Sequence, residues 1–455
     1  MRRVPLFFAL VAALLAFAPA ALADGWLPHP ADATWTYLWS DSVYNTTPTK
    51  EKVTVDKDQS GPNFSLDWTT DGLGNPASAP TSAGTVWFQE TNNGLDIVPP
   101  GWKSNAPPTS FPTLCASASQ CANSLASTYY NVIWGSATPV LVEPLLKGLS
   151  WASTGGTPSD PVASTSEYLG VEPVTVPAFP KPVLAAKVRS DITQAGALGD
   201  PYGSGVRTIW WVYGVGPVKI VFDHAGGSSA AVTTSELQST SLTPVDPPGD
   251  LDYFPIKKGV THTYRWTNPR YLKQPEVQQF TIDAVANGTA RFSVTSVSGP
   301  IRATGAYIYT SRVDGVSNIA ASTKAASLAK LPPLGPKSAP PADRRHFFTP
   351  FDLMDFGFNP ILPAYPKAGD AWVGKASGRD YDVFGVTGST KVLGVQTVKV
   401  PAGKFQALAV QSVLKQQGFP FGSGTRTSWF APSLGLVKLV FRHADGSVSL
   451  VELLK

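Results

Sequence analysis

The stretch that decides the fold occurs twice in this chain. It reads YGSGVRTIWWVYGVGPVKIVFDHAGGS at residues 202–228 and FGSGTRTSWFAPSLGLVKLVFRHADGS at residues 421–447. The two stretches align without a gap, and 15 of their 27 positions are identical. Average amino-acid usage would give roughly one identity in fifteen positions. A match of this size indicates that part of the chain has been duplicated.

Further matches keep the same order in both halves, so the duplication covers whole domains. They pair TYLW at residue 36 with TYRW at 263, the segment ending at Trp151 with that ending at Trp372, and VTVPAF at 174 with VKVPAGKF at 398. Solenoid repeats span only about 20 to 50 residues, so we expect two globular domains, each with its own core. Prolines in the segment 239–258 indicate the boundary. The predicted domains are residues 24–245 and 246–455.

The first 23 residues have the pattern of a secretory signal peptide. Arg2 and Arg3 precede an apolar run at residues 6–17, and Ala21-Leu22-Ala23 supplies the small residues of a cleavage site. No later segment reaches the roughly 18 apolar residues that a membrane-spanning helix needs. We therefore expect a protein that is secreted or resides in the periplasm or cell envelope, without a transmembrane segment.

Composition argues against nucleic-acid binding and favours a β-rich fold. Removing the two signal-peptide arginines lowers the formal net charge from +4 to +2, and a nucleic-acid-binding protein would normally carry a basic stripe. Charged residues make up 15% of the chain, which also contains 40 glycines, 42 prolines and 13 tryptophans. Turn-forming and aromatic residues in these numbers favour β-structure.

Strand-like segments with turns between them recur along the chain. They are residues 34–39, 51–55, 64–68, 280–284, 290–297, 391–400, 405–414 and 436–442. Helix-like segments are few, at residues 316–330 and around 121–130. The predicted fold class is mainly β, with two tandem antiparallel, curved, half-barrel-like domains that each contain one or two short helices.

The duplicated hairpin allows its two faces to be assigned. Pro432 and Gly435 indicate a turn that pairs Phe430 with Leu436, and regular alternation from that pair separates an apolar face from a polar one. The apolar face would contain Trp429, Phe441 and His443 and, in the first copy, Trp210, Phe222 and His224. The polar face would contain Arg426 and Lys438 and, in the first copy, Arg207 and Lys219. A solvated face or an anionic partner would explain these basic pairs.

The second copy carries a family resemblance. The run V-x-V-P-A-G-x-F from residue 398, W-F-A-P-x-x-G-L-V-K from residue 429 and E-L at residues 452–453 resemble uncharacterised exported bacterial β-domains. Those domains look related to the half-barrel fold of periplasmic lipoprotein and lipid carriers. The resemblance implies a curved antiparallel sheet wrapped around a helix, with an apolar concave side. It implies no catalytic signature.

His224 and His443 occupy matched positions, but no catalytic or metal-binding set surrounds them in the sequence. A catalytic histidine needs a nucleophile or a carboxylate, and a zinc site needs three or more protein ligands. We interpret both histidines as strand-end residues bonded to a loop carbonyl. No catalytic residue, metal site or cofactor is predicted.

Two local features belong to the first copy alone. Cys115 and Cys121 are the only cysteines, and in an oxidising compartment we expect them to form a disulfide. Asp56 and Asp67 have the spacing of a calcium loop, although Asp67 replaces the usual glutamate. A hairpin turn is the favoured interpretation of this loop, and a weak calcium site is the alternative.

These observations lead to three functional hypotheses. The first is an exported, non-enzymatic binding or carrier protein for a hydrophobic small molecule or lipid, held by Trp210, Phe222, His224, Trp429, Phe441 and His443. The second is a structural or interaction module of the cell envelope with a protein partner. The third is an enzyme whose site the sequence does not reveal.

Overall fold

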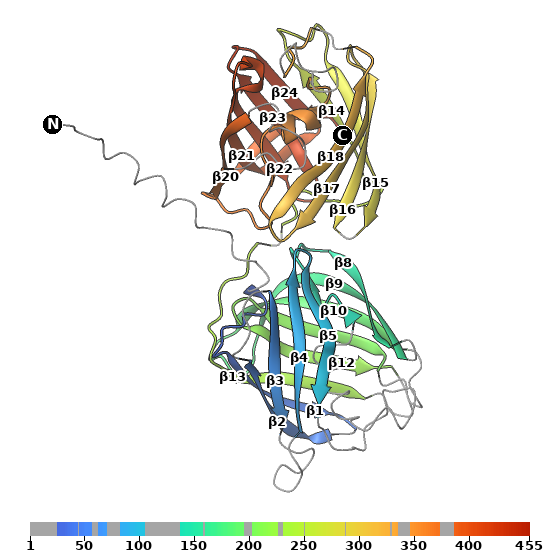
Figure 1. Cartoon of the computed structure of the whole chain (residues 1–455), viewed down its shortest axis with the longest axis vertical. Helices are drawn as coiled ribbons and strands as arrows, with labels where there is room; N and C mark the ends of the chain where they lie inside the picture. The colour runs from blue at the N-terminus through green and yellow to red at the C-terminus, as the bar shows by residue number, and fades with distance from the viewer. Residues whose placement is uncertain are drawn as a thin grey trace, which may run out of the picture. The chain divides into compact units, whose positions relative to one another are not determined.

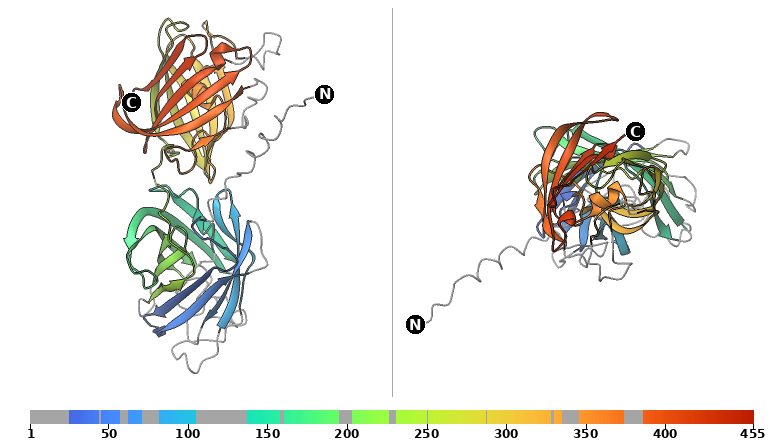
Figure 2. Two further views of the ribbon diagram at one scale, coloured as in Figure 1. Left: turned by 90° about the vertical axis from the view of Figure 1, so that its left-hand side faces the viewer. Right: turned by 90° about the horizontal axis from the view of Figure 1, so that it is seen from above.

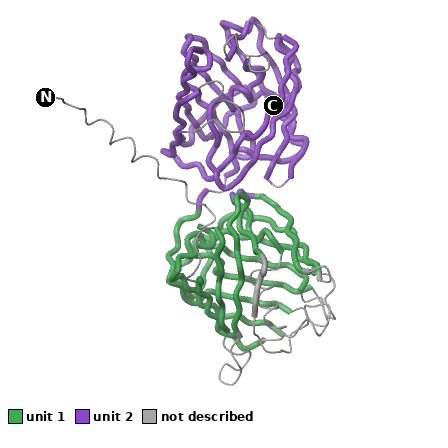
Figure 3. The backbone as a smooth tube through the Cα atoms, viewed as in Figure 1, with its two compact units in different colours: residues 1–143, 148–247 green, residues 144–147, 248–455 purple. Residues whose placement is uncertain are grey.

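Two compact units make up the described part of the chain (Figure 3). The computed structural model describes residues 25–43, 45–56, 62–70, 82–104, 137–157, 160–194, 203–225, 231–249, 251–286, 288–327, 330–334, 346–373 and 386–455. Unit 1 comprises Met1–Glu143 and Gly148–Pro247, and unit 2 comprises Pro144–Lys147 and Pro248–Lys455. The predicted signal peptide and the predicted pair Cys115 and Cys121 lie outside the described residues.

Unit 1 is a single antiparallel sheet, which within the described residues contains 13 strands. The strands are β1 (Thr34–Asp41), β2 (Asn45–Val55), β3 (Asn63–Thr70), β4 (Ser82–Thr91), β5 (Gly94–Ser104), β6 (Ala137–Thr138), β7 (Leu141–Val142), β8 (Ser150–Thr157), β9 (Asp160–Val174), β10 (Val183–Gln194), β11 (Gly205–Val212), β12 (Gly216–His224) and β13 (Val232–Thr240). Their order is β6-β8-β9-β10-β11-β12-β13-β1-β2-β3-β4-β5-β7. Alternate residues of each strand face the interior and form the inner wall of the sheet. On β1 these residues are Trp35, Tyr37 and Trp39, which are buried.

Unit 2 is also one antiparallel sheet, of 11 strands in the described part of the chain. The strands are β14 (Thr261–Thr267), β15 (Glu276–Ala286), β16 (Thr289–Ser298), β17 (Ala303–Arg312), β18 (Gly315–Ala325), β19 (Ala371–Trp372), β20 (Val386–Val400), β21 (Gly403–Gln416), β22 (Gly424–Ala431), β23 (Gly435–His443) and β24 (Val448–Leu453). Helix α2 (Pro350–Asp355) and the 3-10 helix η3 (Pro420–Gly422) complete the unit. The order is β18-β17-β16-β15-β14-β24-β23-β22-β21-β20-β19.

The two strand orders correspond when β1 is aligned with β14. In both units the first strand pairs with the last, as β1 with β13 and β14 with β24. Both sheets curve strongly, as Figure 1 and Figure 2 show. The predicted fold class, mainly β with curved antiparallel domains, is confirmed.

A short corner brings the two ends of the unit 1 sheet together. Strand β6 pairs with β8 and β7 pairs with β5, and only residues 139–140 separate β6 from β7. The amide of Val140 donates to the carbonyl of Leu95 at 2.8 Å. The sheet is therefore nearly closed and barrel-like.

Glycine is required where this corner contacts the sheet. Gly94 has a φ of 130°, and a Cβ there would lie 2.1 Å from the carbonyl oxygen of Leu141. Unit 2 repeats the arrangement, since Gly315 has a φ of 120° and a Cβ would lie 2.0 Å from the carbonyl oxygen of Leu362. Both distances exclude any side chain at these positions.

The helix predicted at residues 316–330 is wrong, because residues Gly315–Ala325 form strand β18. Alanine and lysine favour a helix by propensity, but pairing along β17 outweighs that preference. The helix of unit 2 is α2 instead. Thr349 caps its N-terminus by accepting from the amides of Phe351 and Asp352 at 3.1 and 3.0 Å. The helix-like segment around residues 121–130 lies outside the described residues.

Helix α2 is part of the unit 2 core. All six of its residues are buried. The ring of Phe351 stacks on that of Phe280, with centroids 3.9 Å apart. It also contacts the aromatic rings of Tyr264, Phe292, Tyr307 and Tyr309, which line strands β14, β16 and β17. The sheet of unit 2 therefore encloses a segment of its own chain.

Candidate functional site

A β-bulge changes which residues of the duplicated hairpin face the interior. Phe430 pairs with Leu436 as predicted, but the register shifts between Trp429 and Phe430, so Trp429 pairs with Lys438. One extra residue on β23 reverses the faces beyond it. Arg426 is consequently buried inside unit 2, and Trp429 lies on the outer face.

Unit 1 contains the same bulge. The register shifts between Trp210 and Trp211, so Trp210 pairs with Lys219 on the outer face. Arg207 pairs with Phe222 and is only 6% exposed. The prediction that both arginines lie on a polar outer face, with both tryptophans on the apolar face, is therefore wrong.

The six predicted ligand-binding residues separate into two groups in each unit. Phe222, His224, Phe441 and His443 are buried. Trp210 instead donates from its indole nitrogen to Oε1 of Glu172 at 2.7 Å, and Lys187 Nζ lies 5.2 Å from its ring centroid. Trp429 donates to Oε1 of Gln396 at 3.0 Å. The outer tryptophans and the buried residues do not form one surface.

His443 has the environment predicted from the sequence. Its Nδ1 donates to the carbonyl of Phe421 at 2.6 Å, and its Nε2 accepts from the hydroxyl of Ser449 at 2.9 Å. Burial lowers the pKa of His443 to about 4. The imidazole is therefore neutral at neutral pH and completes a structural hydrogen-bond chain.

The matched histidine of unit 1 belongs to a chain that ends in an acid. His224 Nε2 lies 2.7 Å from Oγ1 of Thr233, which donates to Oδ2 of Asp41 at 2.7 Å. At the corresponding place in unit 2, Asn268 donates from Nδ2 to Oγ of Ser449 at 3.1 Å. A carboxylate in unit 1 thus replaces an amide in unit 2.

A second acid of unit 1 also replaces an amide, and here the hydrogen bonding differs. Glu51 pairs with Tyr37, as Gln278 of unit 2 pairs with Tyr264. The Gln278 amide donates to the carbonyl of Phe348 at 2.9 Å and so anchors the chain that leads into α2. Within the described part of unit 1, neither carboxyl oxygen of Glu51 has a hydrogen-bond partner, although the side chain is fully buried.

The surroundings of Glu51 on the inner wall include further unpartnered polar atoms. Thr70 lies directly opposite Glu51 on β3, and its Oγ1 has no hydrogen-bond partner. The same is true of Oγ of Ser235 on β13. Burial raises the pKa of Glu51 well above its ordinary value, and burial together with the Glu51 charge raises that of Tyr37. An unpartnered buried carboxyl is costly, so this group of residues is the candidate site.

Unit 2 contains a buried acid, Glu276, whose two carboxyl oxygens are both hydrogen-bonded, unlike those of Glu51. Glu276 Oε1 accepts from Oγ of Ser296 at 2.6 Å, and its Oε2 accepts from the amide of Ile301 at 2.8 Å. Arg426 donates to the carbonyls of Leu353 and Phe356 at the end of α2. Arg426 thus bonds the inner segment that contains α2.

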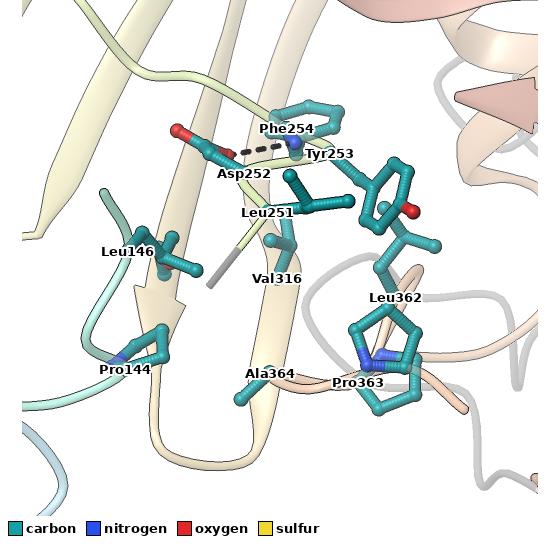
Figure 4. A pocket seen from close by; sticks show the side chains of 12 residues that line it. Pro144, Leu146, Leu251, Asp252, Tyr253, Phe254, Val316, Leu362, Pro363 and Ala364 are labelled. Atoms are coloured by element: carbon teal, nitrogen blue, oxygen red, sulfur yellow. Dashed lines mark hydrogen bonds between the residues drawn. The ribbon is translucent and has the colours of Figure 1, made fainter. Parts of the chain in front are cut away.

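Two cavities lined by described residues of unit 2 are too small for a lipid. The cavity beside Arg426 has a volume of about 10 Å³, roughly the room that one water molecule needs. A second pocket of about 20 Å³ is lined by proline and apolar side chains and by Asp252 (Figure 4). Asp252 accepts from the amide of Phe254 at 2.9 Å, and burial raises its pKa to about 6. Neither space fits an apolar ligand.

Among the described residues, no group of three or more His, Cys, Asp or Glu side chains could hold a metal ion. Asp56 accepts from Oγ of Ser65 and Asp67 from Oγ1 of Thr85, while residues 57–61 of the predicted calcium loop lie outside the described part. In that part of the chain, no helix is both long and apolar enough to span a membrane.

Sequence reasoning missed Glu51, Thr70 and Asp41. A signal for Glu51 was present in TKEKVTV at residues 49–55. There the alternation of an amphipathic strand places Glu51 on the same face as Val53 and Val55, which is the inner face. A charged residue at an inward position is the informative exception to that pattern.

Comparisons with known proteins identify no family. No protein-family model matches the chain, and no curated protein matches it. Matching solved structures include a "putative exported protein with YmcC-like fold" from Bacteroides fragilis, at 10% identity and a TM-score of 0.27, covering 48% of this chain and 99% of that one. Another is a "putative lipoprotein" from Parabacteroides distasonis, at 13% identity and a TM-score of 0.25, covering 48% and 98%. Scores this low carry no functional information.

Proposed function

We propose that the protein is an exported, non-enzymatic binding protein in which unit 1 holds a small ligand and unit 2 is filled by its own chain. Export is inferred from the signal-peptide pattern of residues 1–23. The observation that supports binding is the fully buried Glu51 carboxyl without a hydrogen-bond partner. Buried polar groups in proteins are normally bonded, so such a group suits a ligand.

The contrast between the units supports this division of roles. Where unit 1 has Glu51, unit 2 has Gln278, which is bonded to the chain leading into α2. Two cavities among the described residues of unit 2 measure about 10 and 20 Å³. These small volumes give little support to a hydrophobic ligand in unit 2. The unbonded Glu51 carboxyl gives more support to binding through a polar group in unit 1.

Native mass spectrometry of the full mature chain, purified from an exporting host, tests the proposal. We expect a small-molecule mass that denaturation releases. Thr70→Leu should lower its occupancy because the larger side chain enters the inner wall of unit 1. Ser428→Leu, a matched change in the interior of unit 2, should leave occupancy unchanged. A chain that never retains a small molecule, or that loses it equally in both variants, overturns the proposal.

The envelope-module hypothesis is the second candidate, favoured by the outer face rather than the interior. Trp210 lies between Lys187 and Lys219, whose Nζ atoms are 5.2 and 6.0 Å from its ring centroid. Such an aromatic and charged ladder would suit a protein partner. Pull-down from envelope fractions with Trp210→Ala as control separates the hypotheses, since only a partner surface needs this tryptophan.

A further inference from the structure

The geometry around Glu51 gives the chemical class of the ligand. Tyr37 and Thr70 are the direct cross-strand neighbours of Glu51, on β1 and β3. The hydroxyl of Tyr37 donates to the carbonyl of Pro217 at 2.8 Å, so it does not donate to the Glu51 carboxyl. The Glu51 carboxyl therefore has the Thr70 hydroxyl as a neighbour, and no donor among the described residues is hydrogen-bonded to it.

Aromatic rings flank this carboxyl along the same inner wall. Trp39 lies two residues beyond Tyr37 on β1, and Trp68 lies two residues before Thr70 on β3. Both are buried, at 1% and 2% exposure. Diagonal neighbours on one face of a sheet are separated by about 7 Å, within reach of large side chains. The wall around Glu51 is therefore aromatic as well as acidic.

An acid among aromatic rings suits a positively charged ligand. Aromatic faces attract cations through their quadrupole, most strongly when water is excluded. A nearby positive charge also stabilises the ionised form of a buried carboxyl. Burial alone accounts for the raised pKa of Glu51, with no compensating effect of a basic side chain. Among the described residues, no basic side chain is hydrogen-bonded to Glu51 to balance its charge.

Resting on the proposed function of unit 1, we infer that its ligand carries an organic ammonium group. The Glu51 carboxylate is the counter-charge, and Tyr37, Trp39 and Trp68 supply the aromatic wall. The Thr70 hydroxyl has no hydrogen-bond partner among the described residues. It donates a hydrogen bond to, or accepts one from, a polar group beside the ammonium nitrogen of the ligand. Unit 2 cannot bind such a group in the same way, because an amide, Gln278, replaces the acid.

Isothermal titration calorimetry on the full mature chain tests the inference, with choline chloride as the probe. The controls are 3,3-dimethyl-1-butanol, the neutral isostere of choline, and sodium chloride. Choline should bind, and both controls should not. Glu51→Gln should weaken choline binding roughly 10- to 100-fold, as expected for loss of a charge-assisted contact. Glu236→Gln, which removes an acid paired with Lys219 on the outer face of unit 1, should leave it unchanged.

The outcomes separate this inference from the proposed function. Equal binding of choline and its isostere, or full choline affinity in Glu51→Gln, overturns the ammonium assignment. A chain that retains a small molecule in native mass spectrometry, but does not bind choline, overturns it while leaving the proposed function intact. A chain that does neither overturns both. The isostere comparison uses wild-type protein and so is independent of how any variant folds.

Discussion

Glu51 is an acid whose protonation couples to the stability of unit 1. Burial raises its pKa well above the ordinary 4.5, so the native state binds the proton more tightly than the unfolded chain. The stabilisation is complete below about pH 4.5 and is lost as the pH rises towards the folded pKa. At neutral pH, Glu51 therefore destabilises unit 1.

Replacing Glu51 with glutamine should remove that dependence. We expect Glu51→Gln to be more stable than wild type at pH 7 to 8, with the two converging near pH 4.5, because glutamine does not ionise. Urea unfolding at a series of pH values measures the difference. Curves for the two proteins that stay parallel across this range would contradict the assignment of Glu51 as a buried neutral acid.

His443 has the opposite dependence in unit 2. Its folded pKa of about 4 lies below the ordinary 6.5, so the unfolded chain takes up the proton first. The free energy of unfolding should fall as the pH decreases from 6.5 to about 4, by roughly 3 kcal/mol. His443→Gln should flatten this window in urea unfolding experiments. An unchanged slope in the variant would rule out His443 as its source.

At the scale of elements, the position of α2 depends on its N-cap. Thr349→Ala removes the acceptor for the amides of Phe351 and Asp352 and should destabilise unit 2 by about 1 to 2 kcal/mol. Thr349→Ser keeps the hydroxyl and should recover most of the loss. Amide hydrogen exchange of residues 351–355 measures the effect, and this exchange should be faster in the alanine variant. Equal exchange in Thr349→Ala and Thr349→Ser would mean that packing alone fixes the position of α2.

Strands were predictable from the sequence, but the faces of the duplicated hairpin were not. The alternation of residues 436–442 was sufficient to place β23. The bulge at Trp429 adds one residue on the partner strand, and one residue is enough to exchange inside and outside. Nothing in local composition distinguishes a bulged pair from a regular one, so Arg426 was assigned to the wrong face.

At the scale of the whole molecule, internal comparison of the two copies predicted more than any motif did. TYLW and TYRW align Tyr37 with Tyr264, and the same alignment places Glu51 against Gln278. That acid-to-amide difference was visible in the sequence. Its meaning was not, because only the three-dimensional structure reveals that the Gln278 amide nitrogen donates to the Phe348 carbonyl, whereas neither Glu51 oxygen is bonded among the described residues.

The corner at residues 137–142 has a consequence for how the chain avoids self-association. By pairing β6 with β8 and β7 with β5, it covers backbone groups at both ends of the unit 1 sheet. Open sheet edges are templates for pairing with other chains. Gly94→Ala places a Cβ 2.1 Å from the carbonyl oxygen of Leu141, so it should separate β7 from β5 and expose that edge.

Light scattering after refolding measures the result. We expect Gly94→Ala to form large particles rich in intermolecular strands at concentrations where wild type stays dispersed. Gly249→Ala, where a Cβ meets no atom within 4 Å, serves as the control and should behave like wild type. A six-residue corner would then protect the chain against aggregation.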